Sequence, residues 1–278
     1  MTRKVKKAKI MEKIILCVFI FIILFPIIWI GINSLKYPRD ILSAHLFLFK
    51  PTLKNYISLF FEKGSYFPMY MVNSLIIATS STFLCIVIGS LAAYSFSRFK
   101  FPGNFDKYIF ALLLFTQMIF PIALAIPFYS LMNALKVYDT VFAVIGAHTA
   151  INIPFAIWML KSSFDGLPEN IEEAARIDGC SWLQVLTKVA LPLVAPGMAA
   201  SAIFVFILSW NDYLFPAVLT SSRGTTMPVG LALFVQENIV KWGNICAGAT
   251  FYMIPMFLLT VLIHKHLIKG FTLGVFKG

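Results

Sequence analysis

Long stretches of this chain carry no charged residue. Six such stretches, each 21 to 34 residues long, contain no Asp, Glu, Lys or Arg; they are residues 14–35, 64–97, 108–135, 140–160, 189–211 and 242–264. About 20 consecutive apolar residues are enough for a helix to cross a bilayer. The core of a soluble protein accounts for one such stretch but hardly for six. The pattern therefore predicts an all-α integral membrane protein with six transmembrane helices.

The predicted transmembrane helices lie at residues 14–34, 70–95, 107–129, 139–161, 188–219 and 246–268. Two further apolar stretches, Ile41–Phe49 and Met227–Val235, are too short to span and are expected to be interfacial or re-entrant. Seven prolines at membrane depth each remove an intrahelical hydrogen bond; they are Pro26, Pro121, Pro127, Pro154, Pro196, Pro216 and Pro255. The resulting kinks fit either a transporter that changes shape or simple irregularity of packing. We find no internal repeat that would support an inverted-repeat carrier.

Composition agrees with a membrane protein and gives its orientation. Of the 278 residues, 59% are hydrophobic and only 13% are charged, against about 25% charged in a soluble domain. The net charge of +11 suggests nucleic acid as a partner, but the basic residues are spread along the connections between the spans. Alternate connections hold 15 Lys and Arg in 70 residues on one side and 8 in 79 on the other. Because basic residues favour the cytoplasmic side, we expect both termini to be cytoplasmic.

These patterns divide the chain into three parts. Residues 1–13 form a cytoplasmic N-terminus, residues 14–268 a transmembrane domain, and residues 269–278 a cytoplasmic C-terminal tail. The first apolar stretch is too long for a typical signal peptide and no small-residue cleavage site follows it, which favours an uncleaved anchor. The cysteines are scattered and predict neither a metal site nor a disulfide framework; they are Cys17, Cys85, Cys180 and Cys246.

A polar loop at about residues 165–185 separates the fourth and fifth spans. Pro168 suits the first turn of a helix, where its missing N–H would be unpaired anyway. Glu172 and Arg176 are four residues apart, a spacing that allows a stabilising pair. Gly179 suits the left-handed conformation that ends a helix. Ser181 with Gln184 predicts a capping box for a second helix, so the loop is expected to be a rigid helix-turn-helix.

The spacing of this loop resembles that of a known family. It reads Glu173-Ala174-Ala175, then Gly179, then Val189, then Leu191-Pro192, like the loop of the membrane-spanning subunits of ATP-binding-cassette importers. Val189 stands where Ile is usual and Cys180 where Ala is usual. Other segments resemble sugar-importer permeases, and they are Asn73–Leu75, Ala92–Gly103, Gln117–Pro121, Ile153–Trp158, Ser209–Tyr213 and Lys269–Gly278. The resemblance covers residues 10–278 and is strongest to the second permease of maltose-type importers.

The resemblance implies a type I ABC importer permease fold with a cytoplasmic coupling helix. The implied partners are a second homologous permease, two cytoplasmic ABC ATPase subunits and an extracytoplasmic solute-binding protein, around a bacterial cell membrane. The implied ATPase-coupling residues are Glu172, Glu173, Ala174, Ala175, Arg176, Asp178 and Gly179. No catalytic residue, metal or bound cofactor is expected in this chain. The sequence has no phosphate-binding loop, since Ala249 follows Gly243 and Gly248 where a Lys is required, so ATP and Mg are expected on the ATPase subunits.

The C-terminal tail is expected to contact the ATPase. Lys265 and Lys269 are placed to hold the end of the sixth span at the anionic inner surface. Gly270 is expected to end the helix, and the alternating hydrophobic residues after it predict an extended segment in a groove of a partner. The candidate contact residues are Lys269, Gly270, Phe271 and Thr272. The alternative is a frayed chain end.

Polar residues within apolar stretches are costly and are candidates for the transport pathway or gate; they are Gln117, His148, Asn152, Asn211 and Asp212. His148 and Asn152 are four apart and either line the pathway or bond to a neighbouring helix. Asp212 is placed near the outer end of the fifth span, as a partly wet interfacial carboxylate or, with Asn211, as part of an outer gate.

Three functions remain to be separated from sequence. The favoured one is the permease of a sugar or oligosaccharide importer driven by a separate ATPase. A permease of the same architecture for another solute, such as glycerol phosphate, has the same sequence features. A secondary carrier working alone would be expected to show intramembrane coupling carboxylates or broken repeat helices, and neither is evident.

Overall fold

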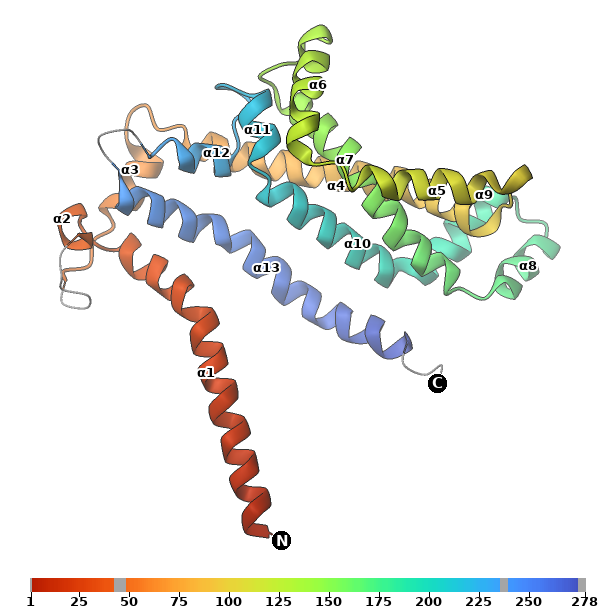
Figure 1. Cartoon of the computed structure of the whole chain (residues 1–278), viewed down its shortest axis with the longest axis horizontal. Coiled ribbons are helices and arrows are strands. Elements are labelled where there is room, and N and C mark those ends of the chain that lie inside the picture. The colour runs from red at the N-terminus through yellow and green to blue at the C-terminus, as the bar shows by residue number, and fades with distance from the viewer. Residues whose placement is uncertain (1, 43–48, 236–239, 275–278) are drawn as a thin grey trace. The chain divides into compact units, whose positions relative to one another are not determined.

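The structure of the chain is a computed structural model that describes residues 2–42, 49–235 and 240–274. Helices joined by short loops make up the described part (Figure 1). The α-helices are α1 Thr2–Ser34, α2 Pro38–Ile41, α3 Lys54–Phe61, α4 Phe67–Arg98, α5 Phe105–Thr116, α6 Pro121–Ala134, α7 Val141–Asp165, α8 Glu169–Ile177, α9 Trp182–Val185, α10 Leu191–Asn211, α11 Leu214–Leu219, α12 Met227–Ala232 and α13 Trp242–Gly274. A 3₁₀ turn, η1, covers Pro102–Asn104, and a π-helical segment, η2, covers Leu186–Ala190.

Five of the described helices, counting α9, η2 and α10 as one continuous span, are long and apolar enough to cross a membrane. A sixth crossing is formed if α5 and α6, which are bent by 96° at a short break, count as one span. The chain is therefore an all-α, membrane-embedded protein, as its charge-free stretches predict. The short apolar stretch after Thr226 is helical only over Met227–Ala232, too short to span.

The third span is broken, so the prediction of one helix over residues 107–129 is wrong. The helix ends at Thr116, and Phe120 has an extended backbone before α6 begins at Pro121. Proline disfavours a helical conformation in the residue that precedes it and has no N–H to continue the helix. Pro121 therefore starts a new helix in a new direction.

The fifth span also differs from the prediction of residues 188–219. It begins earlier, at Trp182, and ends at Asn211, because Asp212 has an extended backbone. The carboxylate of Asp212 then accepts the backbone N–H of Phe215 at 3.1 Å and caps the short helix α11. A polar side chain that captures a backbone N–H offers the chain an alternative to continuing the helix.

The chain forms two compact units. One comprises Met1–Pro68 with Gly230–Ile254, and the other comprises Met69–Val229 with Pro255–Gly278. In the first unit, the Asn55 amide donates to the carbonyls of Ser34 and Lys36, both at 2.8 Å, and so holds α3 against the end of α1. The second unit holds the main core, in which α4, α7 and α10 pack together.

Small residues bring the helices of the second unit close together. A Cβ added to Gly89 on α4 would lie 3.3 Å from the Cβ of Ala156 on α7. A Cβ added to Gly197 on α10 would lie 2.8 Å from the Cβ of Ser163 on α7. Close backbone approach at small residues is a common way to pack helices in a membrane, where burial of apolar surface gives no driving force.

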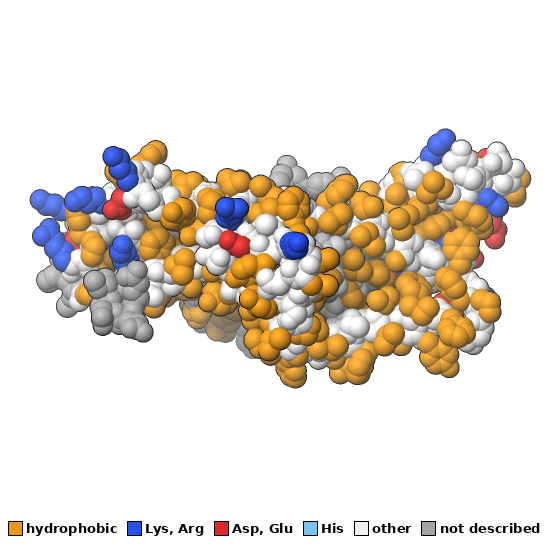
Figure 2. All heavy atoms as spheres, turned by 90° about the horizontal axis from the view of Figure 1, so that it is seen from above, with side chains coloured by type: hydrophobic (Ala, Val, Ile, Leu, Met, Phe, Trp, Pro, Cys, Tyr) orange, Lys and Arg blue, Asp and Glu red, His pale blue; other side chains and the backbone are white. Residues whose placement is uncertain are grey.

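The outer surfaces of the long helices are strongly apolar. Hydrophobic side chains cover much of the face shown in Figure 2. Every side chain of α1 from Met11 to Phe25 is exposed, and most of them are large and hydrophobic. Exposed apolar surface of this extent is expected for a protein surrounded by lipid or by other membrane helices.

Candidate functional site

The polar loop between α7 and α10 folds as a helix-turn-helix. Its first helix, α8, follows Pro168, which lies at the N-cap rather than in the first turn. Gly179 ends this segment with φ +87°, in the left-handed region predicted for it. The Ser181 hydroxyl accepts the N–H of Gln184, and the Gln184 side chain accepts the N–H of Ser181 at 2.8 Å, which is the predicted capping box of α9.

Glu172 is the buried residue of α8, and the predicted pair with Arg176 is wrong. Only 3% of Glu172 is exposed, and its Oε1 accepts Arg98 Nη2 at 2.8 Å. The Tyr94 hydroxyl donates to the other carboxylate oxygen at 2.9 Å. Arg176 instead donates to the carbonyl of Cys180 and lies over the ring of Trp182, at 4.5 Å from its centroid. The carboxylate turns toward the core because two donors from α4 are fixed there.

Arg98 joins three helix ends. Its Nε lies 3.0 Å from both oxygens of Glu172, and its Nη2 also donates to the carbonyls of Phe164 at 3.0 Å and Leu167 at 3.1 Å. These carbonyls belong to the end of α7 and the residues after it, whose backbone acceptors have no partner within the helix. Sequence reasoning missed Arg98 and Tyr94. The available signal was the segment Ala92–Gly103, in which a basic residue closes an otherwise charge-free span.

The opposite side of α8 is open to a partner. Glu173, Ala174 and Asp178 are exposed, Ala175 is half-buried, and Ile177 is 86% exposed. Small alanine side chains let another surface approach the helix closely, and the exposed Ile177 adds an apolar contact. The predicted coupling residues therefore separate into one anchor that faces the core, Glu172, and a free face.

A π-helical segment, η2, connects the loop to the fifth span. It lies between α9 and α10 and directly precedes Leu191 and Pro192. Pro192 has no N–H to offer the carbonyl of Lys188, and its ring crowds that carbonyl, which favours a wider turn at this point. Such π segments occur mostly as single turns and frequently lie at functional sites.

His148 lies at the centre of a buried polar cluster between helices. Its Nδ1 is 2.6 Å from Ser209 Oγ and its Nε2 is 3.0 Å from Asp212 Oδ2. Ser209 Oγ is also 2.9 Å from Ser81 Oγ on α4. His148 is thus bonded to a neighbouring helix, which is the packing alternative raised for it, and Asp212 is both its partner and the cap of α11.

Two other polar candidates do not join this cluster. Asn211 is exposed and donates to the carbonyl of Ile207, one turn earlier in its own helix. Asn152 is half-buried, and its side chain has no hydrogen-bond partner among the residues that the structure describes. Four of the five polar candidates, His148, Asn152, Asn211 and Asp212, therefore lie in the N-terminal half of α7 and at the C-terminal end of α10 but do not form one site.

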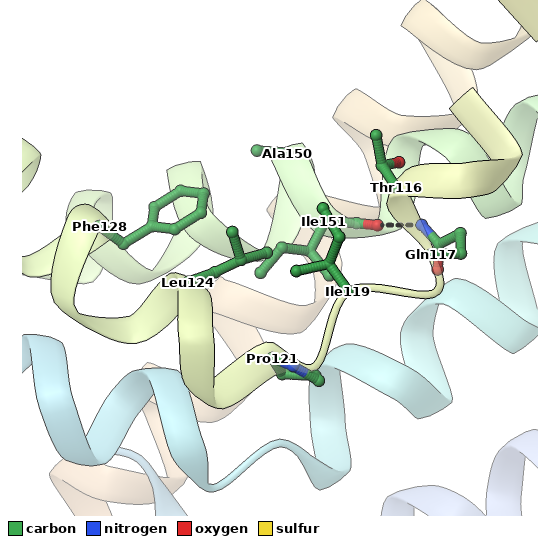
Figure 3. A pocket seen from close by; sticks show the side chains of 8 residues that line it. All are labelled: Thr116, Gln117, Ile119, Pro121, Leu124, Phe128, Ala150 and Ile151. Carbon is green, nitrogen blue, oxygen red and sulfur yellow. Dashed lines mark hydrogen bonds between the residues drawn. The ribbon is translucent and has the colours of Figure 1, made fainter. Parts of the chain in front are cut away.

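Gln117 lines a small cavity at the break between α5 and α6 (Figure 3). The cavity has a volume of about 140 Å³, and its lining residues are Thr116, Gln117, Ile119, Pro121, Leu124, Phe128, Ala150 and Ile151. Gln117 Nε2 donates to the carbonyl of Ile151 at 2.8 Å. Pro154, one turn after Ala150 on α7, has no N–H to offer the carbonyl of Ala150. The cavity is mainly apolar with a few polar groups at one side.

Asp139 organises a loop at the opposite end of the second unit from α8. Its carboxylate accepts the backbone N–H groups of Ser221 at 2.7 Å, Ser222 at 2.8 Å and Arg223 at 3.1 Å, and the Ser222 hydroxyl at 2.8 Å. Burial alone opposes ionisation, but the hydrogen bonds from Ser222, Ser221 and Arg223 outweigh it and hold the pKa of the Asp139 carboxyl well below its usual value. The sequence pattern did not indicate this interaction.

The candidate contact residues of the C-terminal tail, Lys269 to Thr272, lie within the helix α13. This helix continues through Gly270 to Gly274, so the prediction that Gly270 ends it is wrong. A glycine without a positive φ only weakens a helix, and the residues after it do not break one. The side chains of Lys269, Phe271 and Thr272 and the segment 275–278 lie outside the described residues, so their contact with an ATPase stays a prediction. In the described part of the chain, no group of three or more His, Cys, Asp or Glu side chains is arranged to hold a metal ion.

Comparison with known proteins identifies the class. Residues 85–272 match the family described as "Binding-protein-dependent transport system inner membrane component". This chain belongs to that family of membrane permeases. The trehalose/maltose transport system permease protein MalG of Thermococcus litoralis is 36% identical over 259 residues, which are 92% of this chain and 92% of the relative. The trehalose transport system permease protein SugB of Mycobacterium tuberculosis is 34% identical over 92% of this chain and 93% of its own.

A solved structure has the same fold. A chain in the crystal structure of a bacterial ABC transporter involved in the import of the acidic polysaccharide alginate matches with a TM-score of 0.78. The match covers 94% of this chain and 96% of that one, with 22% sequence identity. The helical arrangement is therefore that of an ABC importer permease.

Proposed function

We propose that this chain is the membrane-spanning subunit of an ATP-driven, binding-protein-dependent importer of a sugar or oligosaccharide. Membership of the permease family supports the transport role, and the names of the relatives, trehalose/maltose and trehalose transport system permeases, support a sugar as solute. The observation that carries the proposal is the arrangement of residues on α8. This short helix has one buried anchor, Glu172, and an exposed face on which another protein can bind.

The chain itself is proposed to be non-catalytic. ATP and Mg are bound by two partner ATPase subunits, which dock on α8 through Glu173, Ala174, Asp178 and the turn at Gly179. A second permease and an external solute-binding protein complete the importer. In this assembly α8 and both termini face the cytoplasm of a bacterial cell, and the C-terminal residues Lys269–Thr272 lie near the ATPase.

The solute pathway is proposed to involve the polar candidates at membrane depth. The cavity beside Gln117 is lined by the polar side chains of Thr116 and Gln117 next to apolar side chains, a mixture that suits a hydroxyl-bearing ligand. The exposed Asn211 and the half-buried Asn152 provide further polar groups along the path. His148 and Asp212 are proposed to act as a latch between helices at the outer gate rather than as ligand contacts.

Reconstitution of the complete importer tests the function. The chain is co-expressed with the second permease, ATPase and binding protein encoded with it, purified by a tag on this chain, and placed in liposomes with ATP at the ATPase side. We expect uptake of a labelled sugar that requires both ATP and the binding protein. Glu173→Ala is expected to reduce recovery of the ATPase and uptake, whereas Glu62→Ala, an exposed glutamate outside the loop, is the matched control. Wild-type uptake without any ATPase subunit would contradict the proposal.

A further inference from the structure

We propose that Arg98 is a positioning residue that locks α8 to the end of α4, so that the two helices move as one body when the ATPase moves. The inference rests on the proposed function, in which α8 receives that movement. It assigns a role to the segment Ala92–Gly103, which the coupling loop alone leaves unexplained.

The geometry of Arg98 suits a lock better than a simple charge pair. One guanidinium bonds both oxygens of Glu172 on α8 and two carbonyls, those of Phe164 and Leu167, at the end of α7. The planar guanidinium group of Arg fixes both the direction and the length of its hydrogen bonds. The compact ammonium group of Lys does not fix their direction. Tyr94, one turn earlier on α4, adds a hydrogen bond to Glu172 from a second direction. The orientation of α8 about its own axis is thereby fixed.

Burial restricts the motion of the Arg98–Glu172 contact. The side chains of Arg98 and Glu172 are 7% and 4% exposed, so water competes little for their hydrogen bonds. Net stability alone is a weak reason for such a pair, because removing two charges from water costs about as much as their attraction returns. Directional positioning of α8 is a role that apolar packing of equal volume would not perform.

The other connection of α8 runs along the backbone to α10. Toward α10 the chain passes through Gly179, the single-turn helix α9 and the π segment Leu186–Ala190. Trp182 packs there against Phe99 and Arg176 through ring contacts rather than through a charged fork. A movement of α8 can therefore reach α4 and α7 directly through the Arg98 side chain, and α10 through the connecting backbone.

Distances between spin labels test the lock without any partner protein. Labels are placed at the exposed residues Asn170 on α8 and Lys100 just after α4, in the purified chain. We expect a narrow distance distribution in the wild type and a markedly broader one in Arg98→Lys and in Tyr94→Phe, which keeps the ring. Lys107→Gln is the matched control, because Lys107 is an exposed basic residue on a different helix, α5. Equal widths in all four proteins would overturn the proposal.

The reconstituted importer tests the consequence for coupling. We expect Arg98→Lys to assemble and hydrolyse ATP, with solute imported per ATP lower by roughly tenfold, the factor that loss of one or two charge-assisted hydrogen bonds corresponds to. The double variant Arg98→Met with Glu172→Met leaves no buried charge unpaired and is expected to assemble with the same loss. A wild-type ratio in the double variant, or failure of the double variant to assemble, would assign the pair to folding and overturn the proposal.

The two experiments also separate this proposal from the proposed function. If the label distances broaden as expected but no ATPase associates with the wild-type chain, the lock exists and the importer function fails. If the ATPase associates and sugar uptake requires it, but Arg98→Lys imports as much solute per ATP as the wild type, the importer function stands and the lock fails.

Discussion

At the scale of single residues, Gly179 holds the turn between α8 and α9 through its backbone alone. Its φ is +87°, and a Cβ built there would meet no atom within 4 Å. A substitution therefore acts through backbone strain and not through a clash. We expect Gly179→Ala to cost about 1–2 kcal/mol in the loop conformation, and Gly179→Val to cost more because β-branched residues tolerate this region poorly.

Recovery of the ATPase subunit with the tagged chain measures this effect, and Gly166→Ala is its control. Gly166 lies at the other end of the same loop with φ −76°, and a Cβ there would have its nearest contact at 3.6 Å. We expect normal recovery for Gly166→Ala, reduced recovery for Gly179→Ala and the lowest for Gly179→Val. Equal recovery for all three would show that the left-handed turn is not needed for docking.

Asp139 predicts a pH dependence of stability. Because its pKa is lowered in the folded state, its stabilising effect is complete above the ordinary pKa of an Asp, about 3.9, and is lost as the pH falls below that value. Asp139→Asn is expected to lower the free energy of unfolding by about 1–2 kcal/mol at pH 7. The difference from the wild type is expected to shrink toward pH 3.

Thermal unfolding of the two proteins in detergent, at several pH values, measures this difference. Glu62→Gln, which changes an exposed carboxylate, is expected to follow the wild type throughout. A difference between Asp139→Asn and the wild type that grows as the pH falls would contradict the assignment.

At the scale of elements, the crossing of α7 and α10 depends on Gly197 and Ser163. A methyl group at residue 197 would overlap the Ser163 side chain, so one of the helices has to move. Gly197→Ala is expected to destabilise the chain by about 1–3 kcal/mol, the usual cost of overpacking. Ser163→Gly removes the obstructing atoms, and the double variant is expected to regain most of the loss. Thermal unfolding of the four proteins gives the coupling energy, and additive effects would mean that the two residues act independently.

The ends of the helices show which features the local hydrophobic pattern does not predict. Hydrophobic runs predict that spans exist and roughly where they lie, because a bilayer imposes the same requirement on every span. They do not predict the break before Pro121 or the end of the fifth span at Asn211. Apolar residues resume soon after both breaks, so the hydrophobic pattern alone does not separate a polar interruption from the end of a helix. The backbone effect of Pro121 and the hydrogen bonds of Asp212 to Phe215 and His148 interrupt the helix.

At the scale of the whole molecule, the distribution of basic residues predicts which parts face outward. In intact cells, a membrane-impermeant thiol reagent is expected to label Lys54→Cys and Arg223→Cys and to miss Lys6→Cys, Arg176→Cys and Lys277→Cys. When the membrane is permeabilised, the reagent is expected to label the three protected cysteines as well. This control distinguishes a thiol on the cytoplasmic side from a thiol buried in the protein. A chain with its four native cysteines replaced by Ser provides the background. Labelling of Arg176→Cys from outside would reverse the topology and remove the proposed docking face from the cytoplasm.

The membrane class, the approximate spans and the helix-turn-helix of α8 and α9 follow from local sequence. Each rests on a few neighbouring residues: apolar runs, a left-handed glycine, and a capping box between Ser181 and Gln184. The ion-pair partner of Glu172 does not follow from local sequence. Local spacing pointed to Arg176, one turn away, but the buried carboxylate bonds to Arg98, which is 74 residues earlier in the chain. Only packing of α4, α7 and α8 brings these groups together, because a buried charge pairs with the donor that the fold places beside it and not with its nearest neighbour in sequence.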